Sequence, residues 1–499
     1  MDMKRLLEER ATAYPDKAFL IGEFGSISYA EFDQASDRLA NNLLGLGVRP
    51  GDRVAILHPN SSQLFLAYYA IVKIGAVVVP INPVYTPREI VFILNDSGAT
   101  VLLAHESLSA NAQVAADQAP ALKTVLTRSA NQTMEDALAM SASNGTSLAA
   151  LPELTPDTPA FTFYTSGTTG RPKGVVLTHR NLCFGGPNIA QSFGLRESDV
   201  AMVVLPMVHI FCIASPFMGS LSAGGSVVVL ESFKTEIVLE AFSRHGVTWF
   251  PGVPTMFTYL LSGVDSERHD VSSLRMGLSG GASLPVEVLR QWEERFGARV
   301  IEAYGLTEST GLVACSPVYG ERKPGSIGIS AAGVEVRLVD ERGLEVPVGQ
   351  VGHLVFQGPN GTPGYHRLPE LTAEKIKDGW IYTGDHAYRD ADGHFFIVGR
   401  EAELIITGGY NVYPREIEEV LYAMDGVGEA AVIGVPHPVK GEVPKAFVSL
   451  KPGSEIGAED ILEHCRHSLA PYKLPQIEFM PDLPKNPTGK IMKKELPKQ

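Results

Sequence analysis

Residues 164–174 read Tyr-Thr-Ser-Gly-Thr-Thr-Gly-Arg-Pro-Lys-Gly, and they follow the apolar run 160–164. Glycines let backbone N–H groups approach an anion closely, and serine and threonine hydroxyls add hydrogen-bond donors. Arg171 and Lys173 would add charge-assisted contacts. The string fits neither GxxxxGK[ST] nor GxGxxG, so it is not one of the common nucleotide-binding loops. A flexible surface turn is the alternative interpretation, and the order of these eleven residues favours a phosphate-binding loop over it.

Size and composition narrow the class of protein. The 499 residues are 44% hydrophobic and 20% charged, which is typical of a globular chain of two to four domains. The net charge of −14 argues against a general nucleic-acid binder, because such a protein presents a basic surface. The four cysteines lie far apart, which indicates neither a zinc site nor a disulfide framework. The charged N-terminus has no secretory apolar core, so we expect a cytoplasmic protein.

Residues 200–230 contain no Asp, Glu, Lys or Arg, which is the pattern of a membrane-spanning helix. Pro206, Pro216 and three glycines interrupt this stretch, and His209 lies within it. Proline breaks a continuous helix. We therefore expect a buried core segment here and no transmembrane segment.

Short apolar runs alternate with amphipathic stretches through the first 300 residues. The predicted strands are 54–57, 77–81, 100–104, 201–205, 226–230 and 300–303. The predicted helices are 29–46, 62–74, 234–245 and 285–296. Such alternation predicts α/β layers with largely parallel sheets.

The pattern changes twice toward the C-terminus. The strand-like pieces 325–333, 335–340 and 352–358 are separated by Gly and Pro, which predicts hairpins or a small barrel. After residue 400 a new series begins, with strands at 404–407 and 429–435 and helices at 414–423 and 458–468. The fold class is therefore α/β: a large N-terminal domain, 1–400, of layered αβ subdomains plus a small β-barrel-like part, and a small α+β C-terminal domain, 401–499.

Residues 164–175 resemble the signature loop of the AMP-forming adenylating enzymes, which include acyl-CoA synthetases, peptide-synthetase adenylation domains and luciferases. Five further segments resemble the family's motifs in the family's order. These are Leu205-Pro-Met-Val-His-Ile-Phe211, Tyr304-Gly-Leu-Thr-Glu308, Tyr382-Thr-Gly-Asp385, residues 399–414 and Lys485-Asn-Pro-Thr-Gly-Lys490. The resemblance spans essentially the whole chain and is closest to acyl- or aryl-CoA ligases.

The resemblance implies a reaction in two steps. A carboxylate attacks the α-phosphate of ATP to give an acyl-adenylate and pyrophosphate, and a thiol, usually that of coenzyme A, then displaces AMP. ATP, Mg²⁺ and coenzyme A are the implied cofactors. An enzyme that passes the acyl group to an amine or a carrier protein is the second hypothesis. A non-catalytic binding protein is the third, and the presence of Lys490, Glu308 and Asp385 together argues against it.

The resemblance also assigns the groups that act on the phosphates. Lys490 would bridge the carboxylate and the α-phosphate, where two anions meet and a compact cation stabilises the developing charge. Thr307 would donate to the α-phosphate, and Glu308 with Thr168 would hold Mg²⁺. The phosphate-loop residues are Thr165, Ser166, Gly167, Thr168, Thr169, Gly170 and Lys173. Ordinary alternatives are a solvated tail lysine for Lys490 and a helix-capping acid for Glu308.

The adenosine contacts follow from the same resemblance. Asp385 would accept hydrogen bonds from both ribose hydroxyls, and Arg400 would add a ribose or phosphate contact. Two segments would enclose the adenine, with Tyr304 stacking on it. They consist of Gly281, Ala282, Ser283, Glu302, Ala303, Tyr304 and Gly305. The alternatives are a turn acid for Asp385 and a core aromatic for Tyr304.

The remaining resemblances concern the acyl group, coenzyme A and the rotation of a mobile C-terminal domain. His209 would gate the acyl pocket between the two steps, although a lone histidine in an apolar segment is more commonly a core residue. Gly408 and Gly409 resemble the glycines that let pantetheine pass close to the backbone. Cys212 and Ala402 depart from the family pattern, since relatives often carry Gly and Lys there.

The uncharged segments bear on the substrate. Residues 200–230 and 303–318 contain no Arg or Lys, so a second buried carboxylate would lack a partner there. We therefore expect a monocarboxylic acid with an apolar tail. Fatty, aryl and cyclic acids all stay open, and so does a homodimer, because dimers occur in the family.

Overall fold

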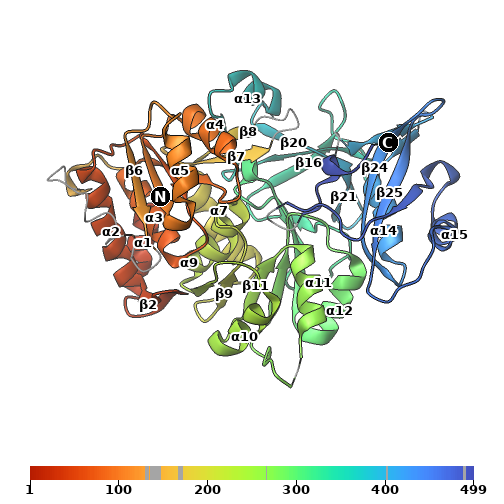
Figure 1. Ribbon diagram of the computed structural model, residues 1–499, viewed down its shortest axis with the longest axis horizontal. Helices are drawn as coiled ribbons and strands as arrows, with labels where there is room; N and C mark the ends of the chain where they lie inside the picture. The colour runs from red at the N-terminus through yellow and green to blue at the C-terminus, as the bar shows by residue number, and fades with distance from the viewer. Residues whose placement is uncertain are drawn as a thin grey trace.

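The computed structural model describes residues 1–498 except 130–133, 135–147, 167–171, 266, 401–402, 409 and 487–489. Two large sheets form most of the N-terminal 330 residues, and a third sheet links them to a C-terminal unit at the right of Figure 1. The layered α/β class predicted from the sequence is confirmed.

The first large sheet has seven strands in the order β18-β8-β7-β4-β3-β5-β6. Strands β3 to β7 are neighbours in parallel, whereas β7 and β8 form an antiparallel hairpin. The strands are β3 (Arg53–Leu57), β4 (Val77–Ile81), β5 (Val101–His105), β6 (Thr124–Arg128), β7 (Pro159–Ser166), β8 (Pro172–Thr178) and β18 (Gly364–Tyr365).

The second large sheet has nine strands in the order β15-β14-β13-β12-β11-β9-β10-β1-β2. The N-terminal strand β1 pairs in parallel with β10, with Leu20 opposite Val227. The strands are β1 (Ala18–Gly22), β2 (Gly25–Ser28), β9 (Val200–Val203), β10 (Ser226–Val229), β11 (Trp249–Gly252), β12 (Met276–Ser279), β13 (Arg299–Tyr304), β14 (Ala314–Cys315) and β15 (Ile329–Ser330).

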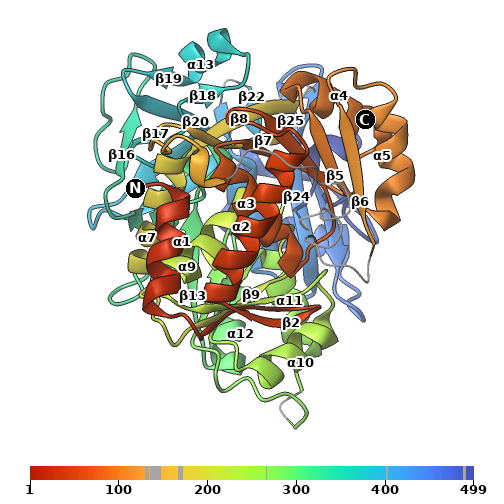
Figure 2. The ribbon, with the colours of Figure 1, turned by 90° about the vertical axis from the view of Figure 1, so that its left-hand side faces the viewer.

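Helix α3 (Ser62–Ile74) lies between the two sheets and contacts both β1 and β4. All its residues are buried, because the helix is apolar on every side and a helix of that kind needs partners all round. The other helices of this region are α1 (Met3–Ala13), α2 (Tyr29–Gly45), α4 (Pro87–Ser97), α5 (Ser109–Ala116), α7 (His179–Ser192), α10 (Thr235–His245), α11 (Pro254–Gly263) and α12 (Val286–Phe296). Figure 2 shows α1, α2 and α3 gathered at one end of the molecule.

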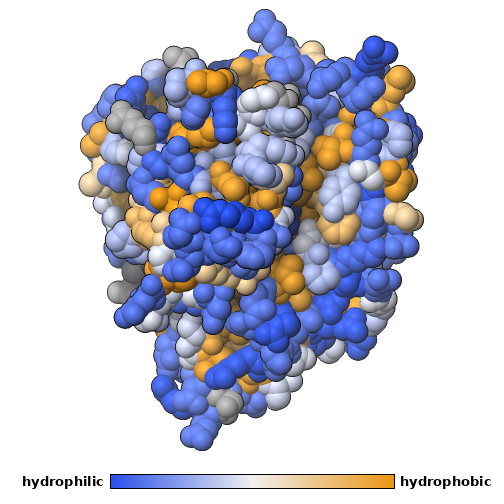
Figure 3. All heavy atoms as spheres, turned by 90° about the vertical axis from the view of Figure 1, so that its right-hand side faces the viewer, coloured by the Kyte–Doolittle hydropathy of each residue, from blue (hydrophilic) through white to orange (hydrophobic). Residues whose placement is uncertain are grey.

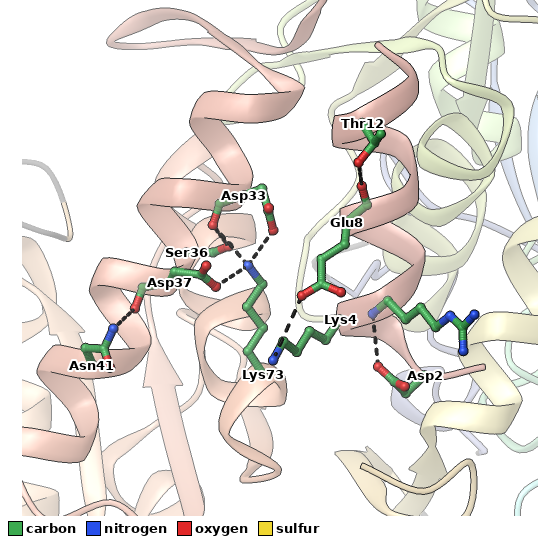
Figure 4. Close-up of polar contacts among 10 residues, drawn as sticks. Asp2, Lys4, Glu8, Thr12, Asp33, Ser36, Asp37, Asn41 and Lys73 are labelled. Carbon is green, nitrogen blue, oxygen red and sulfur yellow. Dashed lines mark hydrogen bonds and ion pairs between the residues drawn. The ribbon is translucent and has the colours of Figure 1, made fainter. Parts of the chain in front are cut away.

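A buried lysine ties α2 to α3 (Figure 4). The Lys73 ammonium lies 2.6 Å from a carboxylate oxygen of Asp33 and 2.6 Å from one of Asp37, and it also donates to the Asp33 carbonyl at 3.0 Å. The Lys73 side chain is fully buried, whereas the Asp37 side chain is 45% exposed. A buried ammonium needs such partners, and three acceptors satisfy its three N–H groups.

The uncharged stretch 200–230 is buried core, as predicted. It forms β9, α8 (Ile210–Cys212), the π-helical turn η3 (Ile213–Gly219), α9 (Ser220–Ala223) and β10. Pro216 lies inside η3, which packs against α7. None of the described helices is both long enough and apolar enough to span a bilayer.

The third sheet has the order β16-β17-β20-β19, with β21 also paired to β20. It contains β16 (Glu335–Val339), β17 (Gly352–Gln357), β19 (Ile376–Lys377), β20 (Trp380–Arg389) and β21 (Phe395–Arg400), and α13 (Pro369–Lys375) precedes β19. The expectation of strand structure throughout 325–333 is wrong, because only β15 forms there. That strand extends the nine-stranded sheet through β14, and glycines with positive φ at 325, 328 and 333 limit its length.

The C-terminal unit has its own sheet and core. Its strands are β22 (Ile405–Thr407), β23 (Tyr410–Val412), β24 (Val427–His437), β25 (Gly441–Leu450) and β26 (Gln476–Phe479), with helices α14 (Pro414–Tyr422) and α15 (Ala458–Ser468). Buried side chains from these elements, including Ile417, Val432 and Ile461, form a separate cluster. Figure 3 views the molecule from this side, and most of that face is hydrophilic.

Candidate active site

The predicted phosphate loop joins β7 and β8 at the end of their hairpin. Thr165 pairs with Lys173 across it, and Ser166 pairs with Pro172. Gly167, Thr168, Thr169 and Gly170 lie outside the described residues. The Thr165 hydroxyl is buried and has no hydrogen-bond partner among the described residues. A buried hydroxyl without a hydrogen-bond partner costs free energy, so the Thr165 hydroxyl is suited to form a hydrogen bond with a ligand.

Glu308 and Lys173 meet next to this hairpin. Glu308 lies in the short turn η4 (Thr307–Ser309) that follows β13, and its Oε1 accepts a hydrogen bond from the Tyr365 hydroxyl at 2.8 Å. The Lys173 ammonium lies 3.9 Å from the same oxygen and 4.8 Å from the Tyr365 ring centre. Burial and the Glu308 carboxylate raise the pKa of Tyr365, so its hydroxyl stays a donor at neutral pH. Two distant motifs thus form one charged cluster.

Hydrogen bonds from Asn360 stabilise the turn that carries Thr307 and Glu308. The Asn360 side-chain amide donates to the carbonyls of Ser309 and Leu312, and the Asn360 backbone carbonyl accepts from the Thr310 hydroxyl at 2.8 Å. Thr310 has a φ of +52°, which is unusual for a residue with a branched side chain. A Cβ on Gly305 would lie 2.2 Å from the Gly311 carbonyl oxygen, so only glycine fits there. Thr307 itself is half-buried at the start of the turn.

Asp385 is the centre of the predicted ribose site. Its Oδ2 accepts from the Tyr304 hydroxyl at 2.5 Å, and its Oδ1 lies 3.2 Å from the Arg400 Nε. The pairing of β20 with β21 sets Asp385 opposite Arg400. Burial and the Asp385 carboxylate raise the pKa of Tyr304, and the same carboxylate raises the pKa of Arg400. A carboxylate has about four lone-pair positions, so Asp385 can still accept hydrogen bonds from ribose hydroxyls.

The two predicted adenine segments lie side by side. Gly281, Ala282 and Ser283 follow β12 and are exposed, and Ala303 and Tyr304 end the neighbouring parallel strand β13. Gly281 has a φ of +78°, a conformation that favours glycine. Both segments leave the carboxyl edge of the sheet, where open α/β sheets bind ligands.

Glu302 differs from its neighbours, because its side chain is buried against the C-terminal unit. Burial raises its pKa to about 7, while Arg415 of α14 lowers it and Glu419 of α14 raises it. The backbone of Glu302 belongs to the adenine segment, but its carboxyl interacts with α14.

His209 immediately precedes α8, and its Nε2 is buried without a hydrogen-bond partner in the described residues. Burial lowers the pKa of His209 to about 4, so the imidazole is neutral at pH 7. Phe211 lies nearby, with its ring tip 3.2 Å from where a Cβ on Gly280 would be, and Cys212 is fully buried. His209 is thus neutral and lies in a segment without charged side chains.

Lys490 comes from the far end of the chain. Its loop is closed by a bridge between Lys485 and Ile491, by the Asn486 N–H to the Lys490 carbonyl at 2.8 Å, and by the Lys490 N–H to the Asn486 Oδ1 at 2.9 Å. Lys490 is exposed to solvent, but the surrounding protein partly desolvates its ammonium; this desolvation and the Arg400 cation lower the pKa of Lys490, whereas Glu403 and Asp385 raise it. Lys490 is thus within electrostatic range of the predicted ribose site.

The hinge and pantetheine assignments are only partly described. Glu403 pairs with Lys493 at 3.1 Å, and Lys493 pairs with Glu418 of α14 at 2.8 Å. Despite burial, the Lys493 ammonium lowers the pKa of Glu403. Gly408 has a φ of +56° and donates its N–H to the Lys440 carbonyl at 2.8 Å. Ala402 and Gly409 lie outside the described residues.

Sequence reasoning missed the partners that hold the site together. They are Asn360, Tyr365, Arg415, Asn486 and Lys493. Most act on residues far away in the chain, and a local pattern carries no signal for such contacts. Asn486 is the exception, since it lies within the quoted Lys490 loop.

Comparison with known proteins identifies the family of this chain. Residues 7–366 match the family model described as AMP-binding enzyme, and residues 416–490 match AMP-binding enzyme C-terminal domain. The chain is 37% identical to feruloyl-CoA synthase of Amycolatopsis sp, covering 94% of this chain and 93% of that protein. It is 36% identical to sulfoacetate–CoA ligase of Cupriavidus necator, covering 98% and 96%.

A solved structure of ATP-bound MatB from Rhodopseudomonas palustris superposes with a TM-score of 0.91 at 34% identity, covering 99% of this chain and 98% of that one. The two family models together cover most of the chain. Both relatives are CoA ligases, and this chain matches them along nearly their full length. This chain therefore belongs to the family of AMP-binding enzymes, as an AMP-forming acid–thiol ligase.

Proposed function

We propose that this enzyme uses ATP to convert an apolar monocarboxylic acid into an acyl-adenylate and then transfers the acyl group to coenzyme A. The observation that carries the proposal is that Lys490 lies within electrostatic range of the Asp385–Arg400 pair, and that Arg400 is itself within range of Glu308, the partner of Lys173. Lys173, Arg400 and Lys490 would supply positive charge to the phosphates of a nucleotide held by Asp385. An anion attacking an anion needs such preorganised positive charge.

In the first step a carboxylate oxygen attacks the α-phosphorus, and the bond to the bridging oxygen of pyrophosphate breaks. Lys490 would neutralise the two approaching anions, and Thr307 would donate to the α-phosphate. Lys173, Thr165 and the rest of the 164–174 loop would orient the β- and γ-phosphates as the leaving group. In the second step the coenzyme A thiolate attacks the acyl carbon and AMP leaves.

Magnesium suits the donors that this site offers. No group of three or more His, Cys, Asp and Glu side chains that could bind a metal occurs in the described part of the chain, and Glu308 is the one carboxylate of the cluster. Mg²⁺ usually binds through one or two carboxylates plus substrate phosphates. Glu308, with Thr168 as predicted, would hold the ion, which neutralises phosphate charge when bound.

The segment around His209 bears on the class of substrate. This segment is uncharged and buried, and His209 is neutral, so a second anionic group on the acid would lack a partner. The names of the two relatives quoted above specify different acids, feruloyl and sulfoacetate, so neither name transfers to this chain. The proposal of an apolar acid is supported by the uncharged segment of this chain around His209.

The division into an N-terminal domain, 1–400, and a mobile C-terminal domain, 401–499, is part of the proposal. The separate core of the C-terminal unit supports it, as does the gap between the two family matches at 366 and 416. We further propose that the enzyme acts in the cytoplasm and forms a homodimer, and light scattering on the purified protein tests the dimer.

The decisive experiment measures AMP release over a panel of acids, each with and without coenzyme A. The panel contains fatty, aryl and cyclic monocarboxylates, with sulfoacetate as the doubly charged member. We expect release with apolar monocarboxylates that rises when coenzyme A is added. Release that needs an amine or a carrier protein would support the second hypothesis, and preference for sulfoacetate would refute the apolar assignment.

A further inference from the structure

Arg415 makes a contact between the C-terminal unit and the rest of the chain. It lies in the first turn of α14, and its side chain is 14% exposed. Its Nη2 donates to the Gly325 carbonyl at 3.0 Å, and its Nη1 donates to the Ile397 carbonyl at 3.1 Å. Both carbonyls precede residue 400, so one side chain joins two segments of the N-terminal part to α14.

The Arg415 guanidinium has several hydrogen-bonding and charged partners. A guanidinium is a planar fork that can donate to two carbonyls at once without losing its charge, and hydrogen bonds from an ionised donor are the stronger kind. Its Nε also lies 3.4 Å from Glu419 on the next turn of α14. Glu302 of β13 is buried on the other side of the interface, where the Arg415 cation favours its ionised form. Arg415 therefore has partners from β13, the 325 loop, β21 and α14.

Helix α14 also connects Arg415 to the catalytic loop. Glu418, one residue before Glu419, pairs with Lys493 at 2.8 Å. Lys493 follows Lys490 by three residues, and its second partner is Glu403 at the predicted hinge. The position of α14 on the N-terminal part thus sets where the Lys490 loop lies relative to Asp385.

We infer that Arg415 is a positioning residue that holds the C-terminal unit in the orientation that brings Lys490 to the α-phosphate. This inference rests on the two-step function proposed above. Arg415 is then needed for adenylate formation and is dispensable for transfer of the acyl group from a finished adenylate. ATP binding does not need it, because the ribose contacts of Tyr304, Asp385 and Arg400 lie in the N-terminal part.

The test separates the two half-reactions in Arg415→Met, Arg415→Lys and the wild-type enzyme. Adenylate formation is followed by exchange of labelled pyrophosphate into ATP, and transfer is followed by thioester formation from supplied acyl-adenylate and coenzyme A. Arg466→Met is the matched control, because Arg466 lies on α15 and, within the part of the chain that the structure describes, its ion pairs are with Glu459 and Glu463 of the same helix.

For Arg415→Met we expect pyrophosphate exchange to fall about tenfold in kcat, the loss that corresponds to one charge-assisted hydrogen bond. The KM for ATP and the transfer rate should stay within about twofold of wild type. Arg415→Lys, which keeps the charge but reaches one carbonyl, should recover part of the exchange rate. Arg466→Met should match wild type in both assays.

Equal loss in both half-reactions, or no loss in either, would overturn the inference. If Arg415→Met does not fold, as judged by thermal melting, Arg415→Lys carries the same test, with a partial loss confined to exchange. Wild-type enzyme without pyrophosphate exchange on any acid would count against the proposed function itself. Wild-type exchange together with unchanged Arg415 variants would count against this inference alone.

Discussion

Among single residues, the role proposed for Lys490 gives the clearest prediction. Lys490→Ala should lower the rate of adenylate formation by about a hundredfold or more, because it removes the cation from the point where two anions meet. Thioester formation from supplied acyl-adenylate should be largely spared. Pyrophosphate exchange measures the first step, and Lys451→Ala, on an exposed surface of the same unit, is the control. Normal exchange in Lys490→Ala would refute the assigned role.

Asp385 tests the nucleotide site separately. Asp385→Asn keeps the shape of the side chain but loses the charge that pairs with Arg400. We expect the KM for ATP to rise about tenfold to a hundredfold, since a hydrogen bond to a charged group is worth about 1.5–3 kcal/mol. Steady-state kinetics at saturating acid gives the value. Asp392→Asn, at an exposed turn, should leave the KM unchanged; an unchanged KM in Asp385→Asn as well would exclude the ribose contact.

At this scale the sequence predicted which polar groups lie near one another but not the side chains that hold them in place. The sequence places Tyr304, Asp385 and Arg400 in one site, and in the structure Tyr304 and Arg400 both contact Asp385. Tyr365, which holds Glu308 from 57 residues away, was not expected. A motif is a local string, whereas the contact of Tyr365 with Glu308 depends on how two sheets meet.

Among the elements, the helices α2 and α3 offer a test of stability. Lys73→Met should lower the free energy of unfolding by about 3 kcal/mol, because breaking a buried ion pair leaves two carboxylates without their partner. Urea denaturation measures this loss. The exposed pair Lys4–Glu8 on α1 is the control, and Lys4→Met should cost less than about 1 kcal/mol. Equal losses in the two variants would mean that burial of Lys73 does not strengthen its contacts.

The elements that periodicity predicted have nearly the observed bounds, although many others were not predicted. Helices 62–74 and 458–468 and strand 77–81 match α3, α15 and β4 to the residue, and outside 325–333 the other predicted boundaries differ by at most two residues. The strand prediction for 325–333 failed because its three glycines suit loops and short strands equally. Its one strand, β15, exists because β14 is beside it, and that neighbour is set by the tertiary fold.

At the scale of the whole molecule, Glu302 makes the stability of the folded chain depend on pH. Its folded-state pKa is about 7 against an ordinary value of 4.5. Between these values the folded chain keeps a proton that the unfolded chain has released. Stability therefore falls as pH rises through this window, by up to about 3 kcal/mol, and levels off above it.

Glu302→Gln removes this dependence, because the amide stays neutral. Relative to wild type, the variant should gain stability between about pH 5 and about pH 8, by up to about 3 kcal/mol. Denaturation at a series of pH values measures the difference. Glu294→Gln, on the exposed face of α12, should run parallel to wild type. A constant difference between Glu302→Gln and wild type at all pH values would show that Glu302 does not titrate in this range.

The pairing of β1 with β10 has a consequence for the newly made chain. Leu20 leaves the ribosome about 200 residues before its partner Val227, which at about 5–20 residues per second is a delay of about 10–40 s. During that time the apolar side chains of β1 and of α3 lack the sheet that buries them. Synthesis of this enzyme should therefore depend on chaperones that shield its N-terminal hundred residues, and truncation before residue 226 should give aggregates.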